Sequence, residues 1–382
     1  MDFSPDEAQQ AVSRAAAGVL ERADAVPSDQ PPGEPWDWPL WQQLGQAGLL
    51  ALVMPDWLGG DGLGVAEAAA LLTEVGRHAA RVPALATLMT GVLPVVRWGD
   101  RDAQAAVLAG VAAGDTVLTA AIREPGEPRP GRPGTTVVQR TSQPPPDRPV
   151  TAVRQRSCWK ACVSGLKVGV PAAARARWLL VPATVPDGGT TVVVVDAAGP
   201  GVSVAAGSGL GPAAEGTVRL EDAPVAYVLG GTDGRAVADL YQLAVAGACA
   251  VADGAVAAAL ELTRAHVAAR QQFGRPLAAF QAVAQQVADV YVTARTLHLA
   301  AVSGAWRLGA GLDAGSDLDV AGYWLAEHGP AALRTCHHLH GGLGMDVSYP
   351  LHRYSALVGD LVRLVGGADY ALDLLGDRCT WS

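Results

Sequence analysis

The stretch RQQFGRPLAAFQ, from Arg270 to Gln281, decides how the second half of the chain folds. It follows a long alanine-rich run of helical character, and Gly274 and Pro276 interrupt that run because neither residue is favoured inside a helix. We expect one helix to end near Arg270 and the next to begin near Leu277. The apolar residues of the second helix recur at three- and four-residue spacing, which places on one stripe Phe280, Val283, Val287, Val290, Ala294 and Leu297.

The same stretch places a cation, an aromatic ring and an amide close to a chain reversal. The guanidinium of Arg270 presents donors in a fork that suits phosphate oxygens, Phe273 can support a flat ring, and Gln281 offers a donor and an acceptor to a heterocycle. The three types together suit an adenine diphosphate. The alternative is an arginine that interacts favourably with a helix dipole, a core phenylalanine and a surface glutamine. Spacing alone favours this structural interpretation.

Patterns to either side divide the chain into three parts. Residues 1–115 predict a helical domain, since apolar residues recur at helical spacing in AEAAALLTEVGRHAA and AVLAGVAAG. Residues 116–231 contain short β-branched runs such as TTVVVVDA, bounded by glycine and proline, and predict a small β-domain. Residues 232–382 return to helical spacing and predict a helical bundle. Two proline-rich segments, 124–134 and 143–149, predict surface loops, because proline does not pair in a ladder.

Composition excludes several classes of protein. The chain has 382 residues, half of them apolar, and a net charge of −9 spread without a block of Lys or Arg. We therefore expect no nucleic-acid partner and no membrane surface. The apolar run from Leu243 to Leu260 contains Asp253 and predicts a buried helix. Five scattered cysteines and an acidic N-terminus predict reduced thiols in the cytoplasm.

A second stretch, CHHLHGGLG from Cys336 to Gly344, ends a predicted helix that runs roughly from Leu318 to His337. Its adjacent glycines allow the backbone to approach a ligand closely. Four metal-ligating side chains gather here, with His352 beyond, but His337 and His338 project in different directions and no carboxylate has ligand spacing. Structural histidines at a helix end are the favoured interpretation, and we expect no metal.

Taken together and in this order, these stretches resemble the acyl-CoA dehydrogenase family along nearly the whole chain. The resemblance rests on WQQLGQAGLLALVMPDWLGGDGLG, on SGLKVGV with ARWLLVPA, on RQQFGRPLAAFQAVAQQVAD and on HGGLGMDVSYPLHRY. It implies a mainly α fold with a small β-domain: an N-terminal helical domain, a β-barrel-like middle domain and a C-terminal four-helix bundle. It also implies dimers of dimers that bind FAD across subunit interfaces.

The resemblance assigns cofactor contacts to Arg270, Phe273, Gln281, His338, Gly341 and Gly342. The first three match residues that contact the diphosphate and adenine of an FAD seated mainly in a neighbouring subunit. His338 and Gly342 match the positions that complete the adenine side, with Gly341 in the same turn, although the family usually has glutamine where this chain has His338.

The chain departs from the family where the reaction needs a base. The family removes the α-proton of an acyl-CoA with a glutamate, because the thioester α-carbon is a weak acid. One location of that glutamate falls on Val365 or Gly366, and the other near Ala244 or Val245. Neither pair can accept a proton, and the nearest acids are several residues away, so we assign no catalytic residue.

The predicted β-domain also departs from the family. The flavin-facing loop, usually like TEPGxGSD, here begins at Arg123 and continues into EPRPG, and Gly169 and Pro171 replace an expected Trp and Thr. The pattern is similar to the non-catalytic subunit of bacterial α2β2 acyl-CoA dehydrogenases that oxidise sterol side chains. That similarity implies a homologous catalytic partner that holds the isoalloxazine ring and most of the acyl-CoA, with an electron-transfer flavoprotein or similar acceptor. Two alternatives are a flavin monooxygenase of the same fold and a flavin-free scaffold subunit.

Overall fold

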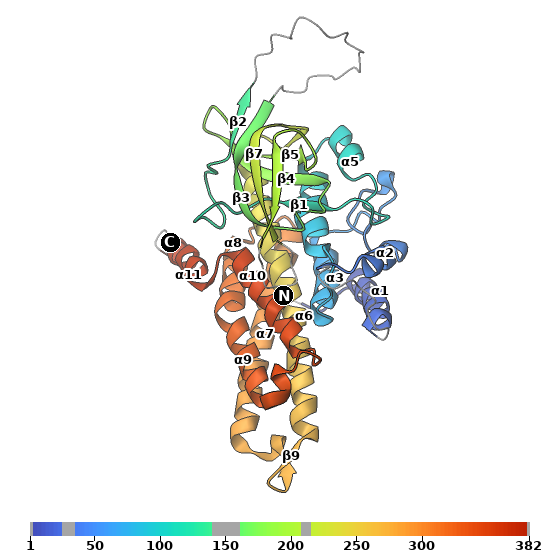
Figure 1. Ribbon diagram of the computed structural model, residues 1–382, viewed down its shortest axis with the longest axis vertical. Helices are drawn as coiled ribbons and strands as arrows, with labels where there is room; N and C mark the ends of the chain where they lie inside the picture. Colours follow the sequence, from blue (N-terminus) through green and yellow to red (C-terminus); the bar gives the residue numbers. More distant parts are fainter. Residues whose placement is uncertain (1–2, 25–34, 140–160, 208–214, 380–382) are drawn as a thin grey trace, which may run out of the picture.

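Helices form the two ends of the chain and strands form its middle (Figure 1). The computed structural model describes residues 3–24, 35–139, 161–207 and 215–379. The N-terminal helices are α1 (Glu7–Asp24), α2 (Trp38–Gln46), a 3-10 turn (Asp56–Leu58), α3 (Val65–Arg77), a π-helical segment η2 (Leu85–Val92), α4 (Leu93–Trp98) and α5 (Arg101–Val107). The glycine-rich stretch after Met54 contains the 3-10 turn and ends where Gly64 precedes α3.

An eight-stranded sheet follows, with the order β6-β7-β3-β2-β4-β5-β8 and with β1 beside β4. Its strands are β1 (Leu118–Ala120), β2 (Thr136–Gln139), β3 (Ala161–Pro171), β4 (Trp178–Thr184), β5 (Thr190–Asp196), β6 (Val202–Ala206), β7 (Glu215–Pro224) and β8 (Tyr227–Leu229). Successive side chains of a strand point to opposite faces. In β5, Val193 and Val195 therefore fill the core of the β-domain, whereas Val192 and Val194 pack into the helical core. The sheet is thereby fixed to the helices.

Two long helices form the axis of the C-terminal half, and a short hairpin at their far end joins them (Figure 1). They are α6 (Arg235–Ala269) and α7 (Gln281–Gly309), joined through β9 (Gln271–Gln272), β10 (Arg275–Pro276) and a 3-10 turn (Leu277–Ala279). The predicted helix end near Arg270 is confirmed, whereas the next helix begins at Gln281 and not near Leu277. Of the predicted stripe, Val290, Ala294 and Leu297 are buried and the first three residues are only half-buried.

Helix α6 is the core helix of the protein, as the run from Leu243 to Leu260 predicted. It is long and apolar enough to cross a membrane, but 89% of its most apolar window is buried inside the protein. Glycines let α3 approach it closely: a side chain at Gly76 would collide with the carbonyl of Val251, and one at Gly254 with the carbonyl of Thr73. Backbone contact between these two helices anchors the N-terminal helices on the bundle.

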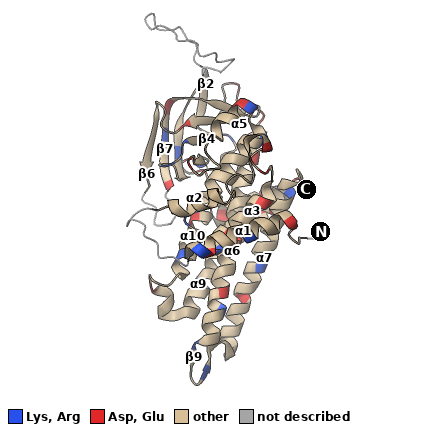
Figure 2. Cartoon of the chain, turned by 90° about the vertical axis from the view of Figure 1, so that its right-hand side faces the viewer, with Lys and Arg blue, Asp and Glu red and all other residues tan. Residues whose placement is uncertain are grey.

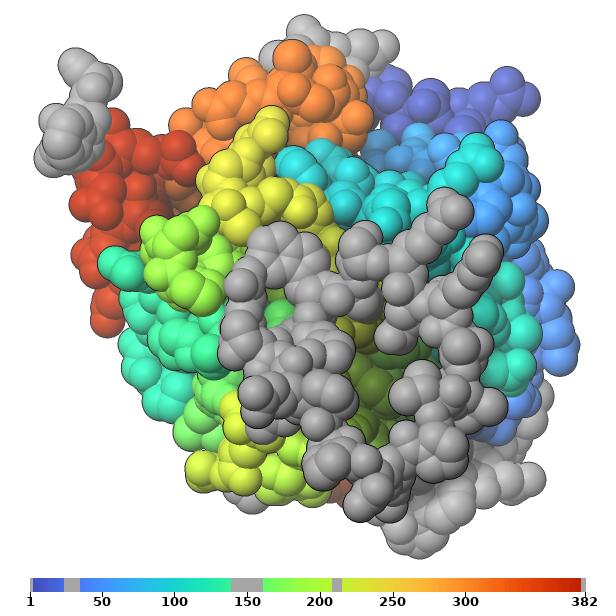
Figure 3. Space-filling view, turned by 90° about the horizontal axis from the view of Figure 1, so that it is seen from above, coloured from blue at the N-terminus to red at the C-terminus, as the bar shows by residue number. Residues whose placement is uncertain are grey.

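The chain ends in α8 (Gly315–Tyr323), a π turn (Trp324–His328), α9 (Gly329–His340), a 3-10 turn (Gly341–Met345), α10 (Leu351–Val365) and α11 (Ala368–Cys379). The helix predicted from Leu318 to His337 thus exists, with a π turn inside it. Figure 3 shows, from above, the N-terminal helices in blue and the C-terminal end of the chain in red on opposite sides of the strands. The mainly α fold with a central sheet is confirmed. The domain limits after residues 115 and 231 stay predictions.

Candidate functional site

The tip of the α6–α7 hairpin holds the first candidate residues. Strands β9 and β10 pair through a two-residue turn in which Phe273 and Gly274 both have positive φ, 53° and 76°. Turns of this kind match the twist of a hairpin but favour Asn or Gly at the first position. A phenylalanine there costs about 1–2 kcal/mol. Its side chain is nevertheless 90% exposed. The strained backbone therefore does not place Phe273 in the core, whereas the structural interpretation required a core phenylalanine.

Aromatic and cationic groups support this turn. Phe280 meets Phe273 edge to face, and the guanidinium of Arg275 lies over the Phe280 ring, 4.0 Å from its centroid. Arg270 and Gln281 lie at the two ends of the loop and are exposed. In Figure 2 the ribbon at this tip carries the colour of basic residues and not that of acidic ones. Within the described residues, neither the guanidinium of Arg270 nor the amide of Gln281 has a hydrogen-bond partner.

The glycine turn after α9 lies beside the end of α6. His340 stacks on His266, with ring centroids 4.5 Å apart, and His266 lies one turn before Arg270. Burial, with the neighbouring His340 and Arg270, lowers the pKa of His266. The exposed candidates of this turn are His338, Gly341 (φ +58°) and Gly342. The structure therefore places the two predicted motifs at the same end of the bundle.

The other histidines of this segment are structural. His337 Nδ1 contacts the carbonyl of Gly344 at 2.8 Å and its Nε2 contacts Ser355 Oγ at 2.7 Å. His340 Nδ1 lies 2.8 Å from the carbonyl of Cys336, and its Nε2 lies 3.0 Å from the hydroxyl of Tyr349. These bonds fix the turn between α9 and α10, which is the role the sequence favoured. No group of three metal-ligating side chains occurs in the described ranges.

The position expected to carry a glutamate is closed. Gly366 follows α10 with φ +97°, and a Cβ built on it would lie 2.5 Å from Tyr370 Cδ1 and 2.9 Å from Pro128 Cβ. Its neighbour Val365 is 1% exposed. The alternative location for the glutamate is also closed, because Ala244 and Val245 are both buried in α6.

Pro128 belongs to the proline-rich segment 124–134, which forms a largely exposed loop as predicted but is fastened to the rest of the protein at several points. Glu124 fastens one end of it: the carboxylate accepts hydrogen bonds from Lys167 Nζ at 2.7 Å, from Thr135 Oγ1 at 2.6 Å and from the backbone N–H of Gly134 and Thr135. Burial opposes ionisation of Glu124, but the bonds from Lys167 and Thr135 outweigh it and lower its pKa. The 143–149 segment lies outside the described residues.

The middle of the segment packs on the C-terminal helices. The hydroxyl of Tyr241 donates to the carbonyl of Pro130 at 2.9 Å, and that of Tyr370 donates to the carbonyl of Arg129 at 3.3 Å. The Arg129 guanidinium also lies over the Tyr370 ring, 5.1 Å from its centroid. We call residues 125–133 the plug, because Pro128, Arg129 and Pro130 at its centre contact the end of α10, α11 and α6.

Charged groups occupy the adjacent corner of the sheet. A Cβ at Gly169 would lie 2.6 Å from the Arg123 guanidinium and 3.3 Å from Glu215 Oε2. Arg363 pairs with Glu215 at 3.9 Å and with Asp360. Burial raises the pKa of Glu215, and the negative charge of Asp360 adds to this rise. The nearby Arg363 and Arg123 lower the pKa but do not outweigh burial. The residue that replaces the expected Trp is thus covered by an ion-pair cluster.

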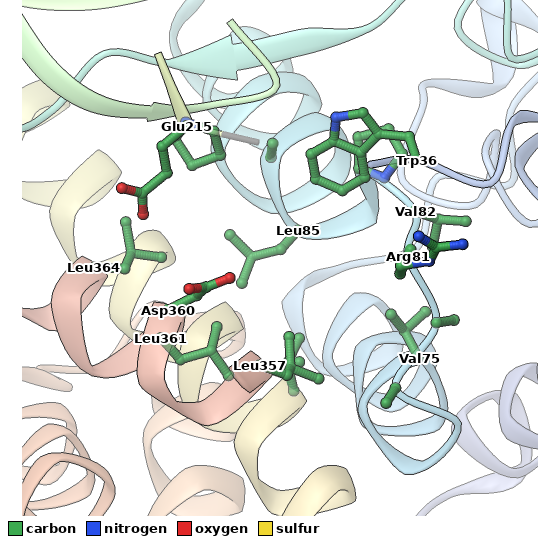
Figure 4. A pocket seen from close by; sticks show the side chains of 16 residues that line it. Trp36, Val75, Arg81, Val82, Leu85, Glu215, Leu357, Asp360, Leu361 and Leu364 are labelled. Carbon is green, nitrogen blue, oxygen red and sulfur yellow. The ribbon is translucent and has the colours of Figure 1, made fainter. Parts of the chain in front are cut away.

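An apolar cleft opens next to this cluster where the helices and the sheet meet (Figure 4). It encloses about 680 Å³, part of it open to solvent. Trp36, Val82 and Leu85 face Leu357, Asp360 and Leu361 of α10 across it, and Glu215 approaches from the sheet. The cleft can hold a small apolar group, but the carboxylates on its wall are already paired.

Comparison with known proteins decides the family. The acyl-CoA dehydrogenase N-terminal domain model matches residues 6–115, and the C-terminal domain model matches residues 242–369. Acyl-CoA dehydrogenase FadE28 of Mycobacterium tuberculosis is 43% identical over 100% of this chain and 99% of its own length. The chain belongs to the acyl-CoA dehydrogenase family.

Two solved acyl-CoA dehydrogenase structures are similar throughout. The ChsE4-ChsE5 complex from Mycobacterium tuberculosis contains a chain that is 30% identical, with a TM-score of 0.86 and all of both chains covered. A variant of the Tcur3481-Tcur3483 steroid ACAD contains one that is 32% identical, with a TM-score of 0.84 and 97% of both chains covered. The predicted family membership is confirmed.

Sequence reasoning missed the groups that close the interior of this acyl-CoA dehydrogenase. It placed Glu124 and Pro128 on a surface loop, whereas both contact residues far along the chain, Lys167 and Gly366. It also gave no role to Glu215. The only signal in the sequence was a buried lysine in the strand pattern SGLKVGV, since a lysine between apolar residues needs a carboxylate partner.

Proposed function

We propose that this chain is a subunit of an FAD-dependent acyl-CoA dehydrogenase that completes the FAD site of a homologous catalytic partner and does not perform the reaction by itself. The observation that carries the proposal is the contact of Gly366 with Pro128 and Tyr370. It leaves no space for a glutamate at the family's usual place. The reaction, α,β-dehydrogenation of an acyl-CoA, then needs the base and the flavin ring of the partner.

The hairpin tip fits the adenosine diphosphate end of FAD. Arg270 would donate to the diphosphate, Phe273 would lie against the cofactor and Gln281 would hydrogen-bond the adenine, with His338 and the Gly341–Gly342 turn completing the contact. All are exposed. A strained, exposed aromatic residue on the same loop as a guanidinium that has no partner among the described residues supports a surface prepared for a ligand or partner.

The isoalloxazine end does not fit this chain. The plug fills the space beside Gly366, and the Arg123–Glu215–Arg363 cluster covers Gly169. A ring seated here would have to displace paired charges and the hydrogen bonds of Tyr241 and Tyr370. A flavin monooxygenase would need this ring site in its own chain, so the geometry favours the subunit role.

The relatives support a partner and a substrate class. The ChsE4-ChsE5 and Tcur3481-Tcur3483 structures contain two different chains, and the second is described as a steroid ACAD. We propose an α2β2 complex in the cytoplasm whose substrate, held mainly by the partner, is a CoA thioester of a cholesterol or other steroid side chain. Bound FAD would accept the hydride and pass electrons to an electron-transfer flavoprotein or a similar acceptor.

Flavin content tests the proposal directly. The chain is purified alone and after co-expression with an acyl-CoA dehydrogenase homologue encoded beside it, and the native mass and the FAD per subunit are measured. We expect no tightly bound FAD on the chain alone, and one FAD per pair of different subunits in an active α2β2 complex. A homotetramer of this chain that holds FAD and oxidises acyl-CoA would contradict the proposal. If substitutions at the hairpin tip left the FAD content of the α2β2 complex unchanged, the chain would be a flavin-free scaffold subunit.

A further inference from the structure

A second cleft lies on the side of α3 and α6 that faces α1 and α7. It encloses about 900 Å³, part of it open to solvent. Its lining comes from the N-terminal segment and four helices: Phe3, Ser4, Pro5, Gln9, Ser13, Ala66, Ala69, Ala70, Thr73, Ala250, Asp253, His298, Ala301, Val302, Ala305 and Trp306. None of these residues belongs to the plug or the hairpin tip, so the cleft is separate from the FAD contacts.

The lining is a trough of small side chains. Three alanines from α3, one from α6 and two from α7 leave the space that larger residues would fill. His298 and Trp306 mark its ends on α7, about 12 Å apart at 1.5 Å per residue. Ala66 lies at the Trp306 end, because its backbone approaches Gly309. Thr73 lies at the His298 end, where it packs on Gly254 beside Asp253.

One end of the trough is polar. His298 Nδ1 lies 2.9 Å from Asp253 Oδ2, and the side chains are 36% and 8% exposed. A carboxylate on Nδ1 holds the proton there and leaves Nε2 as an acceptor. No other described residue bonds this Nε2. A hydroxyl group suits it, because a hydroxyl can donate to a neutral Nε2 in place of water and can also accept from a protonated one.

We propose that this cleft binds an apolar molecule about 10–12 Å long with one terminal hydroxyl group, which donates its hydrogen to His298 Nε2 while the body lies on the alanine floor. The site depends on residues that the FAD contacts do not use, so it stands whether or not the chain serves a flavin partner. Its occupant would bridge the N-terminal segment to the bundle.

The probe is 1-octanol, compared with 1-methoxyoctane, which has the same chain without a hydroxyl hydrogen. Both are titrated by saturation-transfer NMR into the full chain in the form in which it purifies. We expect the alcohol to bind about three- to tenfold more tightly, the usual difference that one neutral hydrogen bond makes. His298→Asn keeps a nitrogen near the place of Nδ1, so that Asp253 stays paired, and removes Nε2; it should abolish the preference for the alcohol.

Ala70→Leu should fill the trough and remove the binding of both probes, since Ala70 is a half-buried lining residue. Ala106→Leu, on the exposed face of α5, is the matched control and should bind both as the unmodified chain does. Equal affinity for the two probes, no binding of either, or a preference for the alcohol that survives His298→Asn would each overturn the proposal. If a variant does not fold, the relative affinities of the two probes for the unmodified chain still test the proposal.

Discussion

The rings of Phe273 and Phe280 meet edge to face at the tip of the α6–α7 hairpin, with centroids 6.1 Å apart and planes at 78°. Phe280 directly precedes α7, so this contact ties the two-residue turn to the start of a long, rigid helix. The tip is therefore ordered before anything binds it. Ordering a binding loop in advance lowers the entropy cost of association.

Replacing Phe273 should separate folding from binding. Phe273→Asn gives the Asn-Gly sequence that this turn favours, and the relief of strain should offset the lost ring contact to within about 1 kcal/mol. The free energy of unfolding, from denaturant titration of the chain, should therefore change little. The FAD content of the complex should fall. A variant that loses stability by several kcal/mol but keeps full FAD content would show that Phe273 is a structural residue.

Arg270→Ala should weaken FAD binding by the complex by about 1.5–3 kcal/mol, the usual contribution of a charge-assisted phosphate contact. The measurement is the dissociation constant of FAD for the apo complex, obtained from flavin fluorescence. Arg295→Ala, which removes an exposed arginine from the middle of α7, is the control and should leave the constant unchanged. An equal loss in both variants would indicate a general charge effect.

The Glu124–Lys167 pair should hold the plug. Lys167 is fully buried, and Glu124→Gln would leave its ammonium without an anion, at a cost of about 3–5 kcal/mol. Lys167→Met should cost less, because Glu124 keeps the bonds from Gly134 and Thr135. Thermal unfolding of the two single variants and the double variant measures the coupling. Additive losses would mean that the pair contributes nothing of its own.

The same pair gives a pH dependence. Because the pKa of Glu124 is lower in the folded protein than its ordinary value of 4.5, its contribution to the free energy of unfolding is complete above pH 4.5. That contribution is lost as the pH falls through the folded pKa. Unfolding of the chain between pH 3 and 7 should therefore show a steeper acid loss than unfolding of Glu124→Gln. Parallel profiles would assign the acid sensitivity to other carboxyls.

Two glycines, one inside α10 and one directly after it, should respond oppositely to alanine. Gly366→Ala places a methyl group against Tyr370 and Pro128 at φ +97°, and should destabilise the chain by about 2 kcal/mol or more. At Gly359, within the helix, nothing lies within 4 Å of the added atom, so Gly359→Ala should be neutral or stabilise by up to about 1 kcal/mol. The denaturant midpoints of the two variants measure these changes. Similar midpoints would mean that the plug moves aside to make room for a side chain at residue 366.

Local patterns predicted the parts of the fold that depend on neighbouring residues. The break at Gly274 and Pro276, the helix spacing of α6 and the β-branched runs of β4 and β5 each reflect a preference of a few adjacent residues. The π turn at Trp324–His328 was not predictable in this way, because one extra residue in a helical turn leaves the surrounding apolar spacing nearly unchanged.

In the candidate site, too, the parts that depend on neighbouring residues could be predicted and the parts that depend on distant ones could not. Arg270, Phe273 and Gln281 lie within twelve residues and carry a recognisable motif, so the sequence could place them at one corner. The exposure of Phe273 could not be predicted, since phenylalanine is usually buried. The closure at Gly366 depends on Pro128, which lies in another part of the chain and contacts it only after the sheet has packed on the bundle.

The contact between Pro128 and Gly366 also has an evolutionary consequence. A glutamate codon at position 366 would yield a side chain that collides with Pro128 and Tyr370 on a backbone that only glycine tolerates. A glutamate at this position would be accommodated only if the proline-rich segment changed at the same time, and each change alone would bring a penalty without a benefit. We therefore expect related chains that keep Pro128 and Tyr370 in this place to keep a glycine at position 366 as well.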